Sequence, residues 1–263
     1  MNIKKTLKVI LPLVLGGFLV WYSLSKVSID TLLQYFKDAN YWWIALGLFF
    51  GILSHLSRAY RWKFLLEPLG YKPDFGNSTM AVLVAYLVNY AVPRAGEVSR
   101  AAVMTNYENI PFEKGFGTIV AERIADVIMM LLIITITLFV QFDFIYELLT
   151  KNFDPTKIGI LLSILILGGF IFTRYVKKAQ SGIGLKIKNF VSGLVEGVTS
   201  IFKMKHKWTF IFHTVFIWLM YVMMFWATIP AIEGLQVPFG GVLIGFIAGG
   251  FSIAATNGGV GLY

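Results

Sequence analysis

Uninterrupted apolar runs recur along the chain, and most are long enough to cross a lipid bilayer as a helix. A hydrocarbon core about 30 Å thick needs roughly 20 helical residues to span it. Polar residues collect between the runs rather than within them, so the pattern predicts an all-α polytopic membrane protein. The apolar windows lie at 7–23, 41–57, 76–93, 115–140, 158–173, 208–231 and 239–257.

Positive charge assigns the connecting segments to the two sides of the membrane. The segment 58–75 is rich in lysine and arginine, and the segment 174–207 holds eight such residues. The segments 24–40 and 141–157 hold two lysines each, against two and three acids respectively. Because lysine and arginine concentrate in cytoplasmic loops, we expect the first two segments inside and the other two outside. This predicts a multi-pass protein of the cytoplasmic (inner) membrane with a cytoplasmic N-terminus.

The N-terminal residues 1–23 place Lys4, Lys5 and Lys8 before an apolar stretch, as a secretory signal peptide does. No small-x-small cleavage site follows Gly17. An uncleaved first span is therefore the favoured interpretation, with a signal peptide as the alternative.

The segment 76–113 must leave the cytoplasm and return to it, because the next window also begins inside. A full return span would carry four charged residues between positions 94 and 108. Each costs about 2.5 to 3.5 kcal/mol near the bilayer centre. A re-entrant hairpin over 78–105 is cheaper, because Pro93 breaks the helix and the polar arm returns through protein or water.

Two further segments complete the expected fold, a single integral membrane domain over 1–263. Residues 179–204 space apolar and polar positions as an amphipathic helix on the cytoplasmic surface does, the alternative being a solvated linker. Residues 239–263 contain "GVLIGFIA", which aligns with "AVLVAYLV" at 81–88, and both stretches precede a glycine-containing break. Two interrupted helices entering from opposite faces are typical of inverted-repeat carriers, although apolar helices also match by chance. The expected fold has about five full transmembrane helices, two re-entrant or broken helices and one interfacial helix.

Composition excludes several function classes. The 263 residues are 57% hydrophobic with a net charge of +9, and since no soluble basic domain is evident, anchoring at the inner leaflet explains this charge better than nucleic acid does. Zero cysteines exclude disulfides, thiol catalysis and thiolate metal sites. No phosphate loop, dinucleotide fingerprint, metal-ligand spacing or nucleophile with a nearby base occurs. We expect no cofactor, no metal and no catalytic residue, which argues against an autonomous soluble-type enzyme.

The first candidate site lies around the predicted hairpin tip, where Arg94 and Arg100 flank Glu97. A guanidinium group donates several hydrogen bonds in a fork that fits phosphate, and Glu97 is placed to orient an arginine. The turn from Pro93 to Gly96 leaves backbone N–H groups free for an anion. The alternative is that the arginines snorkel into the cytoplasmic interface without a ligand.

The second candidate site is "AERIAD" at 121–126. Glu122 and Asp126 are four residues apart and share a helical face, while Arg123 lies about 100° around the helix. Two like charges on one face favour a cation nearby, which Arg94 or Arg100 would supply. The alternative is a span that begins only at residue 124 and leaves both acids in water.

Three motifs resemble the transmembrane region of lysylphosphatidylglycerol synthases and their flippase-like relatives. They are "VPRAGEVSRA" at 92–101, "ERIAD" at 122–126 and "NGGVGLY" at 257–263. The resemblance covers nearly the whole chain and implies a cavity for a charged lipid head group. It implies lipid translocation rather than lipid synthesis, because no soluble aminoacyltransferase domain is present. By position, the implied head-group and hairpin residues are Pro93, Arg94, Gly96, Glu97, Arg100, Glu122, Arg123 and Asp126.

The late motif departs from the family pattern, which usually has a proline before the glycines and a glutamate soon after. Here Thr256 and Asn257 precede the glycines, and the chain stops at Tyr263, which suggests a truncated chain. Asn257, Gly258 and Gly259 form a candidate second loop with close backbone approach, the alternative being an ordinary turn.

The sequence therefore predicts a flippase-like protein that binds or translocates a phospholipid, anionic or aminoacylated, or a polyprenyl-phosphate glycolipid. One alternative is a membrane scaffold that holds a lipid synthase or a glycosyltransferase. Another is a proton-coupled small-solute transporter, in which His55, Glu122 and Asp126 would relay protons. The substrate, the energy source and homo-oligomerisation stay open.

Overall fold

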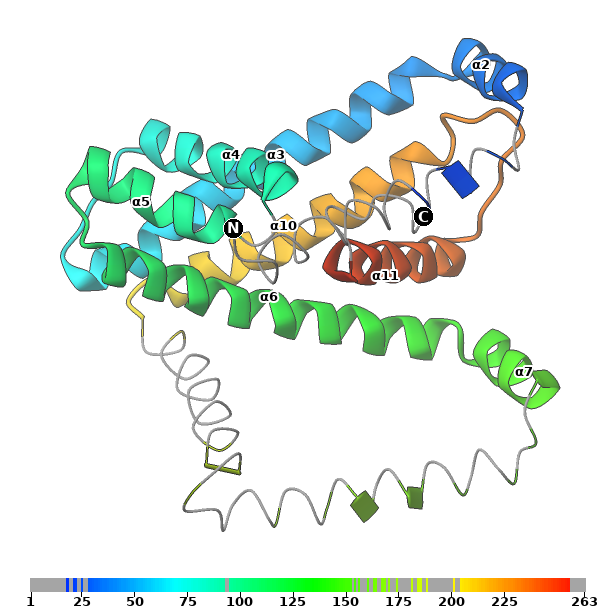
Figure 1. Ribbon diagram of the computed structural model, residues 1–263. Coiled ribbons are helices and arrows are strands. Elements are labelled where there is room, and N and C mark those ends of the chain that lie inside the picture. The colour runs from blue at the N-terminus through cyan, green and yellow to red at the C-terminus, as the bar shows by residue number, and fades with distance from the viewer. Residues whose placement is uncertain are drawn as a thin grey trace, which may run out of the picture. The chain divides into compact units, whose positions relative to one another are not determined.

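The computed structural model describes residues 28–92, 95–152 and 204–255, together with single positions elsewhere (Figure 1). All regular elements in these ranges are helical, so the all-α prediction is confirmed for this part of the chain. Pro93, Arg94, the loop 257–259, most of the first window and most of 158–203, with the greater part of the predicted interfacial helix, lie outside the described residues. The elements are α2 (Ile29–Asp38), α3 (Tyr41–Leu66), η1 (Glu67–Leu69), α4 (Phe75–Ala91), α5 (Gly96–Glu108), α6 (Phe112–Val140), α7 (Phe142–Asn152), α10 (Lys207–Thr228) and α11 (Phe239–Ala255).

The chain divides into two compact units. One comprises Met1–Ile133 and His206–Tyr263 and holds helices α2 to α5, the first part of α6, α10 and α11. The other, Ile134–Lys205, holds the end of α6 and α7. The single integral membrane domain stays a prediction.

Length and apolar composition allow α6 and α10 to cross a bilayer, and α2 with α3 and η1 makes a third span if the bent pair acts as one. The bend between α2 and α3 is 81°. Helix α2 has an apolar face of Ile29, Leu32, Leu33 and Phe36, yet none of its residues is buried, as is typical of a helix lying in the membrane interface. The described residues thus offer two or three candidate spans. The prediction of five full spans and the inverted repeat both stay predictions.

Helices α3 and α10 lie side by side along much of their length (Figure 1). Asn40 begins α3 by accepting a hydrogen bond from the Trp42 backbone N–H at 3.1 Å. A Cβ atom on Gly51 would lie only 3.0 Å from the Met224 sulfur of α10. Small residues at such contacts let two membrane helices approach closely, so Gly51 allows α3 and α10 to pack closely.

Helix α3 is longer than the sequence indicated. The apolar window ended at residue 57 and the segment 58–75 was expected to be a cytoplasmic connection, but the helix continues to Leu66. Arg58 and Arg61 are consequently buried, with 2% and 0% exposure. The expected connection is helix through Leu66, because no proline or glycine interrupts 58–66 and because the arginines find acidic partners inside the protein. The cytoplasmic location of the segment stays a prediction.

Helices α4 and α5 pack against each other as a hairpin, with the break where the sequence predicted it. Asp74 caps the start of α4 by accepting hydrogen bonds from the backbone N–H groups of Gly76 and Asn77. At the other end, Asn89 of α4 accepts the Gly96 backbone N–H at 2.7 Å, which fixes the start of α5 against α4. The hairpin thereby holds the first turn of α5 at a defined position.

An apolar cluster joins α6, α10 and α11. Ile133 of α6, Trp218 and Val222 of α10, and Leu243 of α11 are buried together, and Met129, Met130, Phe246 and Ile247 pack against them. The described part of the predicted second broken helix is therefore an apolar helix docked on this cluster.

Candidate functional site: a buried charge cluster

Two acids of α6 form the centre of the site. Glu122 is 0% exposed and Asp126 is 7% exposed. Helix α6 begins at Phe112, ten residues before Glu122, so the alternative in which the acids stay in water does not hold in this structure. As predicted, the i, i+4 spacing puts both side chains on one face, toward the partners described below.

Asp126 is a hydrogen-bond acceptor shared by three helices. Its Oδ2 atom accepts from Arg58 Nη1 at 2.9 Å and from Arg123 Nη1 at 3.3 Å. Its Oδ1 atom accepts from Arg61 Nη2 at 3.3 Å and from Trp218 Nε1 at 3.4 Å. One carboxylate thus joins α3, α6 and α10.

Glu122 pairs with Arg100, one of the two arginines that the sequence indicated as its partner. Arg100 Nη1 of α5 donates to Glu122 Oε2, and Arg61 Nη2 lies 3.6 Å from Glu122 Oε1. The Arg100 guanidinium stacks on Trp62 at 3.7 Å from the ring centroid. Trp62 in turn donates from Nε1 to Thr118 Oγ1 at 2.8 Å. Glu122 therefore ties α5 to α6, and Trp62 fixes the plane of the arginine.

The buried charges do not balance. Among the described residues, three buried arginines, Arg58, Arg61 and Arg100, face two buried carboxylates, which leaves one positive charge in excess. Arg100 Nε and Nη2 are buried and have no hydrogen-bond partner among the described residues. Uncompensated charge inside a protein is costly, so an anion would stabilise this cluster.

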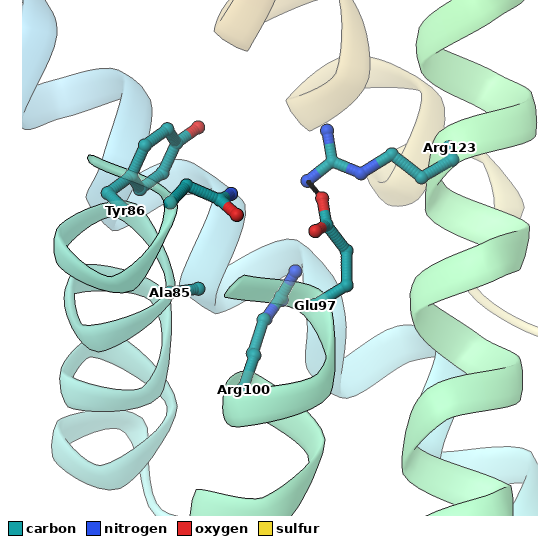
Figure 2. Close-up of a pocket in the computed structure, with 6 residues that line it drawn as sticks. Ala85, Tyr86, Glu97, Arg100 and Arg123 are labelled. Atoms are coloured by element: carbon teal, nitrogen blue, oxygen red, sulfur yellow. Dashed lines mark ion pairs between the residues drawn. The ribbon is translucent and has the colours of Figure 1, made fainter. Parts of the chain in front are cut away.

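A small pocket opens beside the cluster (Figure 2). Its cavity volume is about 20 Å³, roughly the room that one water molecule needs, and the 220 Å³ of free space around it includes open solvent. Its floor includes Arg100, and Glu97 and Arg123 pair across it with 3.5 Å between Oε1 and Nη2. The pair is partly exposed, with 28% for the Glu97 side chain and 45% for Arg123. The remaining lining residues are Ala85, Tyr86 and Asn89 of α4.

A polar chain connects the pocket to the buried carboxylates. The hydroxyl groups of Tyr86 and Tyr221 are 2.9 Å apart, and Arg58 Nη2 donates to the Tyr221 hydroxyl at 3.3 Å. The His55 ring packs against Tyr86 with 4.4 Å between centroids. Residues from α3, α4, α6 and α10 therefore share one hydrogen-bonded network.

The structure brings together five of the residues that the sequence singled out: Glu97, Arg100, Glu122, Arg123 and Asp126. Gly96 begins α5 at the pocket, where its N–H bonds to Asn89 rather than staying free for an anion. Arg94 and Pro93 lie outside the described residues, as does the candidate loop Asn257, Gly258 and Gly259. No group of three or more potential metal ligands occurs in the part of the chain that the structure describes.

Sequence reasoning missed Arg58 and Arg61 as site residues, because it counted them as cytoplasmic charges. Their i, i+3 spacing on an uninterrupted helix, opposite the i, i+4 acids of 122–126, was the signal available. It also missed Trp62, Tyr86 and Tyr221, for which a single sequence offers no comparable pattern.

The sequence pattern of the lysylphosphatidylglycerol synthase TM region matches residues 9–263. The chain belongs to this family. Membership in the lysylphosphatidylglycerol synthase TM region family, together with α6 and α10, makes it a membrane protein. The charge cluster lies within the matched residues.

Two relatives match parts of this family member. A UPF0104 membrane protein of Methanocaldococcus jannaschii is 30% identical over 129 residues, which cover 48% of this chain and 38% of the relative. The glycosyltransferase AglD of Haloferax volcanii is 32% identical over 92 residues, which cover 35% of this chain and 15% of the relative. The chain therefore matches well under half the length of each relative. No solved structure gives a significant match.

Proposed function

We propose that the protein binds the head group of a phosphate-bearing lipid in the pocket beside the charge cluster and translocates it across the membrane. The candidates are an anionic or aminoacylated phospholipid and a polyprenyl-phosphate glycolipid. The observation that carries the proposal is the excess of one positive charge in a buried cluster that borders an open pocket.

Charged residues inside membrane proteins are expensive, and they mark substrate and ion pathways. Arg100 and Arg123 present guanidinium groups to the same pocket, and such groups suit the oxygens of a phosphate. Glu122 and Asp126 are already paired with arginines, so Glu97 is the acid that an amine on the head group would meet. We therefore propose a transport role for these residues rather than an enzymatic one.

The length of α4 and the charges of α5 support a re-entrant placement of the hairpin in the membrane. Helix α4 has 17 residues, or about 26 Å at 1.5 Å per residue, which is shorter than a hydrocarbon core of about 30 Å. Helix α5 carries Glu97, Arg100 and Glu108. We therefore propose that the α4–α5 hairpin is a re-entrant element of the cell's inner membrane and that the N-terminus lies in the cytoplasm.

A second candidate function is a membrane subunit that serves a lipid synthase or a glycosyltransferase. The relative named as a glycosyltransferase favours it, because only 15% of that protein matches this chain. In this alternative the charge cluster would stabilise the fold and would not contact a lipid.

Flip assays on reconstituted vesicles test the first proposal. We expect the protein to accelerate the exposure of fluorescent phosphatidylglycerol, lysylphosphatidylglycerol or undecaprenyl phosphate to an outside quencher, compared with protein-free vesicles. Arg123→Gln should slow this by roughly tenfold or more, because a charge-assisted hydrogen bond contributes about 1.5 to 3 kcal/mol. Arg123 is suited to the test because it is partly exposed: its loss removes one of the donors to Asp126 but leaves the Arg58–Asp126 and Arg100–Glu122 pairs in place.

Arg174→Gln is the matched control, since Arg174 is an exposed arginine that stacks on Phe170. No acceleration with any of the three lipids, or equal rates for Arg123→Gln and Arg174→Gln, would contradict lipid translocation. Retained binding of a soluble enzyme with silent Arg123→Gln would favour the membrane-subunit alternative.

A further inference from the structure

We propose that Glu97 is a built-in competitor for the ligand's anion: it occupies Arg123 in the empty pocket, and a phosphate must displace it to bind. The inference rests on the proposed head-group binding and adds a mechanism that regulates access to the same site.

Arg100 provides the fixed half of the anion site. Its side chain is 2% exposed, and the bond from Nη1 to Glu122 and the stacking on Trp62 hold it in place. Its Nε and Nη2 atoms are buried without a hydrogen-bond partner among the described residues, although Arg100 lines the pocket. A buried donor that borders an opening is satisfied when an acceptor enters.

Arg123 provides the exchangeable half. Figure 2 shows the ends of Glu97, Arg100 and Arg123 converging, with the dashed ion pair joining Glu97 to Arg123. At 3.5 Å this pair is longer than the hydrogen bonds of the buried cluster, and both side chains are partly exposed. Exposed ion pairs are weak, so a stronger acceptor can replace Glu97 without disturbing the buried cluster.

The charge balance favours such an exchange. With Glu97 in place, the outer pair is neutral and the buried cluster contributes one positive charge. When the Glu97 side chain leaves, Arg123 and the cluster together present two positive charges to the pocket. Glu97 therefore limits which anions can bind, because a ligand must be a better hydrogen-bond acceptor for Arg123 than the Glu97 carboxylate that is already paired with it.

Binding measurements on the full chain in detergent test the competitor role. The probes are dihexanoyl phosphatidylglycerol, a phosphate diester with a lipid head group, and inorganic phosphate. Glu97→Gln should bind the lipid probe roughly two- to fivefold more tightly than wild type, the factor set by losing a weak exposed pair. Arg123→Gln should bind it more weakly. Glu113→Gln, which removes an exposed glutamate in the first turn of α6, should match wild type.

The outcomes separate the two proposals. If Arg123→Gln weakens lipid binding but Glu97→Gln does not strengthen it beyond Glu113→Gln, the competitor role is overturned and head-group binding stands. If wild type binds neither probe, head-group binding is overturned and the competitor role falls with it. If only inorganic phosphate binds, and Glu97→Gln strengthens it, the competitor role stands and the lipid source is overturned.

Discussion

Asp126→Asn is expected to destabilise the protein by about 3 to 5 kcal/mol, because removing one partner of a buried ion pair leaves uncompensated charge. The carboxylate accepts hydrogen bonds from Arg58, Arg61 and Arg123, and from the Trp218 indole. An asparagine amide carries no charge and cannot accept all of these donors. The free energy of unfolding in detergent micelles, followed by tryptophan fluorescence during denaturation, checks the prediction.

Asp143→Asn is the control for this change, since Asp143 is an exposed acid in the first turn of α7. It should alter the free energy of unfolding by no more than about 0.5 kcal/mol. Equal stabilities for the two variants would mean that the Asp126 contacts do not hold α3, α6 and α10 together.

The residues of the charge cluster that lie on one helix could be predicted from the sequence. Periodicity along α6 was enough to place Glu122 and Asp126 on one face, because that relation is local to a single helix. The charged pattern 94–100 also indicated Arg100 as a partner, since two like charges on one face favour a cation. Local patterns thus predicted one half of the site.

The other half depends on how distant helices pack. Arg58 lies 68 positions from Asp126 in the sequence, and Tyr86 lies 135 positions from Tyr221. The positive-inside rule treats arginine as a signal for the cytoplasmic side, and it does not register that the same arginine is neutralised by an acid on another helix. A buried ion pair therefore makes a helix look shorter in a hydropathy profile than it is, as α3 shows.

Gly96→Ala is expected to cost at least about 1 to 3 kcal/mol, the usual range for overpacking a tight contact. A Cβ atom at this position would collide with the Ala85 carbonyl oxygen and lie 2.6 Å from Asn89 Cγ. The carbonyl belongs to the backbone of α4 and cannot rotate away, so α5 must move and the bond from the Gly96 N–H to Asn89 is strained or lost. Denaturation in detergent micelles measures the loss of stability.

Gly117→Ala is the matched control, because an added Cβ atom there meets no atom within 4 Å. Glycine in a helix interior is about 0.8 to 1.0 kcal/mol less favourable than alanine, so this variant should be more stable than wild type. The two substitutions add the same methyl group and are expected to change the free energy of unfolding in opposite directions.

If Gly96→Ala were instead neutral, the contact between α4 and α5 would be looser than in the structure. The hairpin would then not explain the fixed position of Arg100 at the pocket. A matching fall in the binding of dihexanoyl phosphatidylglycerol by Gly96→Ala would link the hairpin contact to the anion site, because α5 carries both Glu97 and Arg100.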